Sequence, residues 1–358
     1  MSYKVVEIQE ADSLDICELY EKVFGKPMCR KNSSEIFSWF YFNNIYKKHY
    51  CRGIYKDKAF SAYWGFIPIE CIIHNKILKG SLCFQLASTP EILGATLLLW
   101  KKIKNELIND NVVISFTIGN ENSCLLQKNL GFEAEKTPIL INALHPFKLI
   151  NDLISEKISN RIVNKITKKI FLSLDYILSN FVSLLHNEND HVVAVNYFDK
   201  NYNELWDIMS KSVNYGVNLD DRYINWRYIE KPNNTYRILS YVYGGRVMGY
   251  LIYRTKKDFG THIGFIMDII ADPNNKNVIN SLIYCAKKEL FQKGVTIISA
   301  LSFKDNIFYK NLKGAGFFNV PKKFLPHKSY FGINKFIESE NDFEVNKWHI
   351  SWGNHDNK

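Results

Sequence analysis

The stretch "IGNENSCLLQKNLGF", Ile118–Phe132, marks the junction of a strand and a helix. A run of strand-forming residues, "VVISFTIG" (112–119), leads into a polar cluster that starts at Asn120. A short helical pattern follows and stops at Gly131, with Phe132 behind it. Because the first N–H groups of a helix lack intrahelical partners, we expect Asn120 to accept hydrogen bonds from them.

The same pattern occurs twice in the chain, at a nearly constant spacing. Both copies contain an aromatic helix, a strand–turn–strand unit, an apolar strand followed by a proline, an amphipathic helix, a buried-type strand and a closing glycine–aromatic pair. The matching landmarks are Trp39 and Trp226, Pro90 and Pro273, and Gly131 and Gly316. Several landmarks at one spacing indicate a duplication.

The order of elements predicts an α+β fold made of two tandem domains. Each domain is expected to hold a mixed, mostly antiparallel sheet with flanking helices and one parallel strand–helix–strand crossover. The predicted boundaries are 1–146 for the first domain and 188–358 for the second. Residues 147–187 form a predicted helical linker between them.

The linker has a distinct pattern of its own. Isoleucine recurs every fourth residue from Ile150 to Ile170, and Lys and Arg fill much of the remainder. This predicts a basic amphipathic helix. Its isoleucine stripe is expected to pack on a core, and contact with a membrane surface is the alternative.

Composition limits the classes of function. At 358 residues, two domains are expected, and the 46% apolar content is sufficient for real cores. No uninterrupted apolar run is long enough for a membrane helix, and the first residues lack signal-peptide character. The seven cysteines are scattered, with neither a CxxC pair nor Cys/His ligand spacing. We therefore expect a reduced, cytoplasmic protein without a metal site.

The formal net charge of +10 has two readings. It describes either a solvated Lys-rich surface or a preference for polyanionic ligands such as nucleotides or coenzyme A. No basic stripe with interleaved aromatic residues is present, so a nucleic-acid partner is not expected.

The residues Asn120, Ser123 and Gly131–Phe132, together with "EILGAT" (91–96), resemble the GNAT acyltransferase superfamily. The resemblance covers both halves. The duplicated form, with its Trp226–Tyr228 helix and its "WHISWGNHD" tail (348–356), is similar to acyltransferases found beside surface-polysaccharide genes. The resemblance implies two tandem GNAT-like domains and acetyl transfer from acetyl-CoA.

The resemblance also implies where the cofactor binds. Its pantetheine arm would pair with splayed strands, and its pyrophosphate would lie at a helix amino terminus. The residues implied are Leu86, Ala87, Ser88, Leu93, Gly94, Ala95, Thr96, Asn120, Ser123 and Gln127. Two positions depart from the family pattern: Glu91 replaces a Gln or Arg, and Gln127 replaces a tyrosine acid. The matching loop of the second half, "DPNNKNVIN", lacks glycine, so the first half is expected to bind the cofactor.

The second half contains the candidate catalytic residues Asp268 and His355. Asp268 lies in "GFIMDIIADP", where the first copy has Gln85, and burial there would raise its pKa toward that of a base. The alternative is a structural Asp that pairs with Arg227. A His titrates near neutral pH, which suits His355 for the same role.

Candidate acceptor-binding residues have aromatic, basic or acidic side chains. They are Trp226, Arg227, Tyr228, His349 and Asp356. Arg227 would contact a phosphate, because its counterpart in the first copy is Phe40. Trp226 and Tyr228 have aromatic counterparts there, so a role in the core is the alternative. Trp348, Ile350 and Trp352 alternate like a strand that docks.

Three functions are compatible with these features. The first is N-acetyltransfer to a small amine, for which the resemblance implies a nucleotide-linked amino sugar. The second is a Fem-type aminoacyltransferase. The third is a non-catalytic binding protein, which the departures at Glu91 and Gln127 favour. The oligomeric state is left open.

Overall fold

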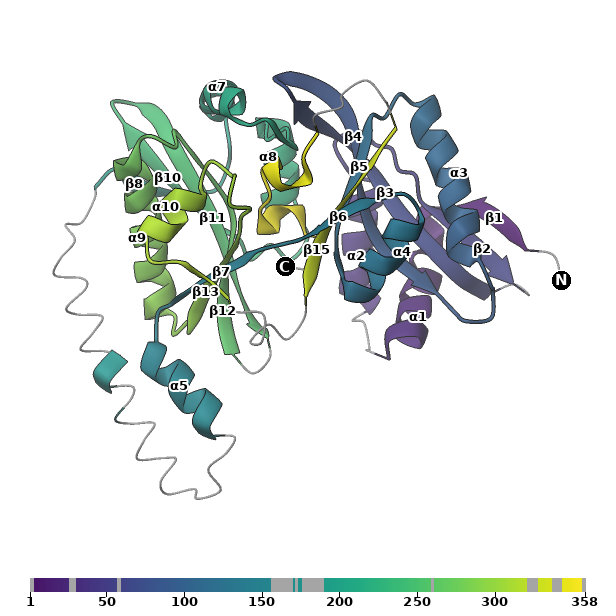
Figure 1. Cartoon of the computed structure of the whole chain (residues 1–358), viewed down its shortest axis with the longest axis horizontal. Coiled ribbons are helices and arrows are strands. Elements are labelled where there is room, and N and C mark those ends of the chain that lie inside the picture. Colours follow the sequence, from purple (N-terminus) through teal and green to yellow (C-terminus); the bar gives the residue numbers. More distant parts are fainter. Residues whose placement is uncertain are drawn as a thin grey trace.

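The computed structural model describes residues 3–25, 30–56, 59–155, 170, 173–175, 190–258, 261–320, 328–336 and 343–355. These residues form two mixed sheets with flanking helices, placed side by side (Figure 1). The predicted α+β class with two tandem sheets is confirmed.

The first half of the sequence supplies most of one sheet. Its elements are β1 (Lys4–Glu7), η1 (Glu10–Asp12), α1 (Ser13–Phe24), α2 (Arg30–Tyr41), β2 (Arg52–Lys56), β3 (Ala59–Ile73), β4 (Lys76–Ser88), α3 (Ala95–Asn109), β5 (Ile114–Asn120), α4 (Glu121–Asn129), β6 (Glu133–Lys136), β7 (Ile139–Ala143) and α5 (Pro146–Ser155).

The second half repeats this succession. Its elements are β8 (Val192–Val195), α7 (Lys200–Met209), η2 (Ser210–Ser212), β9 (Tyr215–Val217), α8 (Asp221–Tyr228), β10 (Arg237–Tyr243), β11 (Arg246–Asp258), β12 (Thr261–Ala271), α9 (Lys276–Gln292), β13 (Ile297–Leu301), α10 (Tyr309–Gly314), β14 (Phe318–Asn319), β15 (Ser329–Lys335), η4 (Val345–Lys347) and η5 (Trp352–Asn354).

The first sheet contains two strands from the second half of the sequence, β15 and the short β9, and the second sheet contains one strand from the first half, β7. The first sheet has the order β1-β2-β3-β4-β5-β15-β6, with β9 pairing β3, and the second has the order β8-β10-β11-β12-β13-β7-β14. The orders correspond strand for strand, with β15 in the place that β7 holds in the other sheet. The ranges 1–146 and 188–358 therefore do not each carry a complete sheet, and those domain boundaries stay a prediction.

The exchanged strands make the same contact in both sheets. On β15, the Asn334 amide donates to the Leu130 carbonyl (3.3 Å), just before Gly131. On β7, the Asn142 amide lies 3.5 Å from the carbonyl of Ala315, just before Gly316, and also donates to the Gly316 carbonyl (2.8 Å). Both glycines have positive φ, 89° and 84°, which a glycine adopts without steric cost after a helix.

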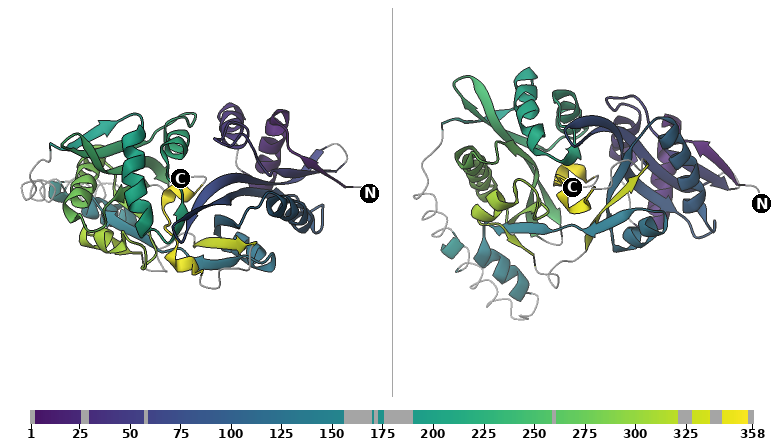
Figure 2. Two further views of the ribbon diagram at one scale, coloured as in Figure 1. Left: turned by 90° about the horizontal axis from the view of Figure 1, so that it is seen from above. Right: turned by 45° about the horizontal axis from the view of Figure 1, so that its top comes forward.

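Side chains of the first sheet alternate between two cores. On β3, Tyr63 belongs to the large core that contains α1 and α2 residues, and Trp64 packs with Trp100 of α3 in a second core. This period of two follows from the strand geometry. The helices α1 and α2 consequently cover one face of the sheet, and α3 covers the other (Figure 2).

The two copies meet through their aromatic helices, α2 and α8. Trp39 and Trp226 stack across the pseudo-symmetric interface, with ring centroids 4.8 Å apart and planes at 22°. Both rings are buried. Trp226 is therefore a residue of the core and not an exposed acceptor-binding residue. A role in the core was the alternative predicted from the sequence.

The predicted linker is described only in part. Helix α5 forms, and the carboxylate of Asp175 accepts hydrogen bonds from the N–H groups of Phe147 and Lys148 at its start (3.0 and 2.8 Å). Most of the predicted helix over 147–187 lies outside the described residues. Among the helices that are described, none has the length and apolar content needed to cross a bilayer.

Candidate functional site

In both sheets the two central parallel strands separate after a short paired stretch. Strands β4 and β5 pair only from Gly80 to Leu82 and from Ile114 to Phe116. Strands β12 and β13 pair only from Ile263 to Phe265 and from Ile297 to Ser299. We call the unpaired ends beyond these positions the first splay (β4 after Leu82, β5 after Phe116) and the second splay (β12 after Phe265, β13 after Ser299).

A bulge accompanies each splay. The register of β3 with β4 shifts so that Gln85 has no opposite residue, and Gln85 has φ of 40°. The register of β11 with β12 shifts in the same way at Met267. Asp268 is thus opposite Ile252, as Leu86 is opposite Trp64. The predicted match of Asp268 with Gln85 is nevertheless supported, because the Tyr41 hydroxyl donates to the Gln85 amide oxygen (3.4 Å) as the Tyr228 hydroxyl donates to the Asp268 carboxylate. Leu86 lies on the other face of its sheet, in the core beside α3, so the two bulges differ in position by one residue.

The first splay is partly open to solvent. Gln85, Leu86 and Ser88 on β4 are half-buried, whereas Ala87 is buried. On β5, Ile118 and Gly119 are half-buried and Asn120 is exposed. The strand ends implied as the cofactor site are therefore within reach of a ligand.

The loop after β4 leads to a helix start without a side-chain cap. Gly94 is the N-cap of α3, with φ of 77°, and a Cβ at this position would meet nothing within 4 Å. Ala95 is buried, Thr96 is half-buried and Leu93 is 99% exposed. The N–H groups of the first turn of α3 have no intrahelical acceptors, so this end of the helix suits an anion.

The acidic residue in this loop has a basic partner. Glu91 lies 3.2 Å from the ammonium group of Lys22, and both side chains are about half exposed. Lys22 thus offsets part of the negative charge that departs from the family pattern. The matching helix of the second copy, α9, differs: the Asn275 side chain accepts from the N–H of Val278 (3.3 Å) and caps its start.

The polar cluster after β5 caps α4, as predicted. The Asn120 side-chain oxygen accepts from the Ser123 N–H (2.9 Å), and the Ser123 hydroxyl donates back to the Asn120 carbonyl (3.0 Å). Ser123 also lies so close to Gly119 that a Cβ there would overlap its hydroxyl. Asn120 and Ser123 therefore fix the turn at the end of the first splay.

Gln127, at the place of the family's tyrosine acid, is turned into the protein. The residue is 5% exposed, and its Oε1 has no hydrogen-bond partner among the described residues. It lies beside two glycines, Gly119 of β5 and Gly332 of β15. A buried amide at this position cannot protonate a leaving thiolate.

The second splay, in contrast, is filled by the C-terminal segment, Trp348–His355. All residues of β12 from Gly264 and of β13 from Ile298 are buried. The Trp352 indole donates to the Ser299 hydroxyl (3.1 Å) and packs edge-on against Phe265 with ring centroids 5.5 Å apart. In Figure 1 this segment (yellow) lies between the two sheets.

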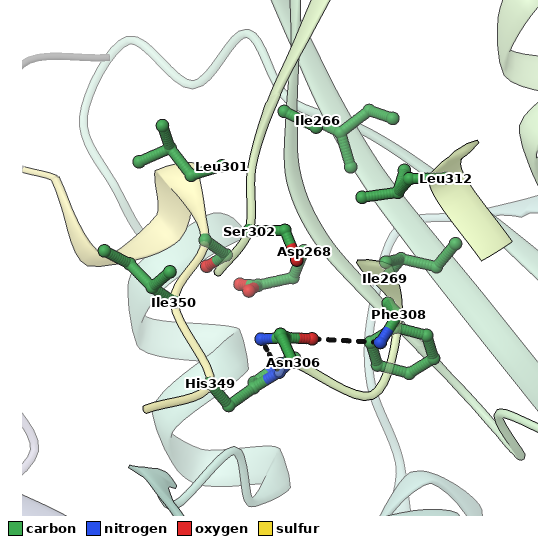
Figure 3. A pocket seen from close by; sticks show the side chains of 12 residues that line it. Ile266, Asp268, Ile269, Leu301, Ser302, Asn306, Phe308, Leu312, His349 and Ile350 are labelled. Carbon is green, nitrogen blue, oxygen red and sulfur yellow. Dashed lines mark hydrogen bonds between the residues drawn. The ribbon is translucent and has the colours of Figure 1, made fainter. Parts of the chain in front are cut away.

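Asp268 lies beneath this segment, at a cavity of about 20 Å³ (Figure 3). Its carboxylate accepts a hydrogen bond from the Tyr228 hydroxyl. Burial raises the pKa of Asp268 to about 6, while hydrogen bonds from Ser351 and Tyr228 and the charge of Arg227 act in the opposite direction. The expected rise in pKa is confirmed, but the hydrogen-bond partner is Tyr228.

Arg227 holds the C-terminal segment. The guanidinium is 1% exposed and donates to the Gly353 carbonyl from Nε (3.2 Å) and Nη2 (3.0 Å), and to the His355 carbonyl from Nη2 (2.8 Å). In this arrangement its Nε and Nη2 donors face backbone carbonyls, and the whole side chain is shielded from solvent. Tyr228 is also fully buried.

The histidines differ in environment. His349 is 8% exposed, and burial lowers its pKa to about 4. Its Nδ1 accepts from the Asn306 amide (3.0 Å), whose orientation is set by the hydrogen bond from the Phe308 N–H to the amide oxygen (Figure 3). His355 is half-buried. Asp356 lies outside the described residues.

The C-terminal segment docks, as expected, but not as a strand. It follows one 3-10 turn, η4, and contains a second, η5, and among the described residues it is joined to Tyr215 by a single β-bridge at Trp348. The hydrogen bonds of Ser351 explain η5: its hydroxyl accepts from the Gly353 N–H (3.1 Å), and its own N–H donates to Asn354 (3.0 Å). Ser299, Ser351 and Gly353 were not anticipated, because their partners at the second splay (Trp352, Asp268 and Arg227, respectively) are distant in sequence.

No cluster of three or more His, Cys, Asp or Glu side chains suited to a metal ion occurs among the described residues. A separate groove of about 490 Å³ runs along the interface of the copies. The described residues that line it are Ser34, Glu35, Ser38, Trp39, Asn43, Glu230 and Pro232.

The chain is similar in fold to solved N-acyltransferase structures. Saccharomyces cerevisiae N-myristoyltransferase with bound myristoyl-CoA matches with a TM-score of 0.58 and 12% identity, over 94% of this chain and 79% of that chain. A GCN5-related N-acetyltransferase from Anabaena variabilis matches with a TM-score of 0.58 and 11% identity, over 92% and 72% of the two chains.

A probable N-acyltransferase from Enterococcus faecalis matches with a TM-score of 0.55 and 11% identity, over 94% of this chain and 73% of that chain. No protein-family model and no curated protein matches the sequence. The structural matches confirm the fold, a pair of tandem GNAT-like domains.

Proposed function

We propose that the protein transfers an acyl group from acyl-CoA, acetyl-CoA in the simplest case, to the amine of a small molecule, with the donor in the first splay. The observation that carries the proposal is the contrast between the splays. The first has partly exposed strand ends beside an uncapped helix start at Gly94, whereas the second is filled and its helix is capped by Asn275.

For acyl transfer, the donor site must bind the pantetheine arm, polarise the thioester carbonyl and hold the pyrophosphate. The two amides of the pantetheine arm would pair with the free edges of β4 and β5, in the manner of an added strand. A backbone N–H between Leu86 and Ser88 would polarise the thioester carbonyl. The first turn of α3 would hold the pyrophosphate. With Gln127 buried, the thiolate would leave and take its proton from water.

Of the two predicted bases, we propose His355. Asp268 is covered by Tyr228 and by the segment around Gly353, so an acceptor amine would have to displace that segment to reach it. His355 is half-buried, and its backbone is held by Arg227, so its position is fixed without closing the ring off from solvent.

The acceptor that we propose is a nucleotide-linked amino sugar for surface polysaccharide, which the sequence resemblance and the net charge of +10 support. Its phosphates would need a cation other than Arg227, whose donors are engaged. The interface groove, with Glu35 and Glu230, offers carboxylates to an ammonium group. An amino sugar without phosphates should therefore be compared with the nucleotide-linked amino sugar as a substrate. The cytoplasmic location stays a prediction.

Calorimetry and thiol release test the proposal together. We expect acetyl-CoA to bind with a stoichiometry of one, and thiol release to start when an amino-sugar nucleotide is added. His355→Gln should lower kcat by about 100-fold or more at unchanged acetyl-CoA affinity, the usual range for loss of a general base. Asp268→Asn is the matched variant and should retain turnover.

Two outcomes would contradict parts of the proposal. An absence of acyl-CoA binding would remove the donor site itself. Binding without thiol release from any amine would favour the non-catalytic alternative, for which the buried Gln127 already argues. Faster turnover of free amines than of nucleotide-linked ones would replace the acceptor class and keep the reaction.

A further inference from the structure

We infer that the second splay is a peptide-binding site whose ligand is the chain's own C-terminal segment, Trp348–His355. In the second sheet this segment occupies the place that corresponds to the partly open first splay. This inference does not depend on acyl transfer, because it concerns only what binds between β12 and β13 in the second copy.

The segment is bound by side chain and backbone, as a peptide ligand is. Trp352 is 4% exposed, with its ring against Phe265 and its indole N–H on Ser299. The carbonyls of Gly353 and His355 accept three hydrogen bonds from Arg227. One anchoring aromatic side chain and a charged donor for the backbone are features of peptide recognition sites.

The first copy lacks the groups that hold the segment. The counterpart of Arg227 is Phe40, which has no donor and packs on Phe84 of β4 with ring centroids 4.3 Å apart. The counterpart of Tyr228 is Tyr41, whose hydroxyl lies against Gly65 of its own sheet. In the second copy, the Tyr228 hydroxyl lies instead against Gly353 of the C-terminal segment.

Gly353 is the residue that sets the specificity of this site. A Cβ at Gly353 would overlap the Tyr228 hydroxyl and the Asp268 carboxylate, and both of these groups are buried and bonded to each other. Neither can move without breaking that hydrogen bond inside the protein, which is costly. The site is therefore specific for a peptide in which Trp is followed directly by Gly, as in Trp352–Gly353.

The segment also contacts the first sheet. Trp348 is fully buried and lies against Phe116, the last paired residue of β5, with ring centroids 4.9 Å apart. It also lies near Phe331 of the exchanged strand β15, at 5.5 Å. The ligand thus touches both sheets, and its removal would loosen their contact.

The experiment cuts the folded chain. A protease site placed between Phe336 and Phe343 lets the full-length protein fold first and be cleaved afterwards. We expect the cleaved segment to stay bound on size exclusion, and a fluorescent synthetic peptide of residues 343–358 to exchange into the site. If cleavage releases the segment and lowers Tm, the added wild-type peptide should restore Tm in proportion to its concentration.

A glycine pair supplies the control. A peptide with Gly353→Ala should compete at least tenfold more weakly than the wild-type peptide. In the uncut protein, Gly353→Ala should lower Tm, whereas Gly314→Ala, at a position with open space around it, should not. Equal competition by both peptides, or loss of the segment without any change in Tm, would overturn the inference.

Discussion

The first and second splays are built from corresponding strands in the same order, yet the first is partly open to solvent and the second is filled by the C-terminal segment. Each lies between parallel strands that pair at only three positions and beside a hairpin with a bulge. The first keeps half-buried residues such as Leu86, whereas every residue of the second from Ile266 to Ala271 is buried.

This difference shows that the duplicated fold forms a splay in each copy, and that a few substitutions decide what fills each splay. The residues that differ are Phe40 and Arg227, Gly94 and Asn275, and Gln85 and Asp268. Arg227 and Asp268 bind the C-terminal segment, and Asn275 closes the helix start that Gly94 leaves open.

The largest effect is expected from emptying the second splay. Trp352→Ala removes a buried indole and should cost about 3–5 kcal/mol of unfolding free energy. Leu86→Ala, the matched truncation at the half-buried first splay, should cost about 1 kcal/mol. Urea unfolding of both variants measures this. Similar losses would mean that the two splays are packed alike.

A smaller effect follows from the carboxylate in the second splay. The pKa of Asp268 is about 6 in the folded protein and 3.8 in its ordinary state, so folding favours the protonated form. Its contribution to stability is therefore fully present below about pH 4 and is lost as the pH rises through 6, with an upper bound of about 3 kcal/mol.

Asp268→Asn should flatten this pH dependence. Because Asn keeps a hydrogen-bond acceptor for Tyr228, the variant should be more stable than the wild type near pH 7 and lose its advantage near pH 4. Unfolding free energies from pH 4 to pH 7.5 test the sign. A variant that is less stable than the wild type at pH 7 and gains nothing over this range would show that the ionised form is the favoured one.

The smallest effect on stability comes from two glycines with positive φ. Gly94 (φ 77°) starts α3 and Gly294 (φ 68°) follows α9, and a Cβ at either meets nothing within 4 Å. Alanine at each should cost about 1 to 2 kcal/mol, because L-residues disfavour this conformation. Only Gly94→Ala should weaken acyl-CoA binding, by roughly tenfold or about 1.4 kcal/mol, since only its Cβ would lie beside the pyrophosphate. Equal affinities in the two variants would move the donor away from α3.

The elements of the fold were predictable because they depend on local patterns. The strand–helix junction at Asn120, the strand–turn–strand unit of each copy and the amphipathic helices α3 and α9 follow from alternation, turn residues and capping. The exchange of β7 and β15 was not predictable, because both strands have ordinary alternating sequences and nothing local specifies which sheet they join.

The candidate site was predictable in outline. The asymmetry between Phe40 and Arg227 predicted a phosphate contact for Arg227, whereas its partners in the structure are the backbone carbonyls of Gly353 and His355, which have no signature in the sequence. The raised pKa of Asp268 followed from its apolar neighbours. That Tyr228 and Ser351 would be the groups around it depends on contacts between distant segments.

The strand exchange has a consequence for the protein while it is being made. Strand β5 is completed early in synthesis, but its neighbour β15 comes much later. Lys328, the residue before β15, and its partner Glu121 are 207 positions apart. At typical translation rates the edge of β5 stays unpaired for roughly 10 to 40 s. An open strand edge of this kind can pair with other chains, so a chaperone would matter most after the first copy has been made and before β15 is. A chain that ends before β15 is expected to aggregate.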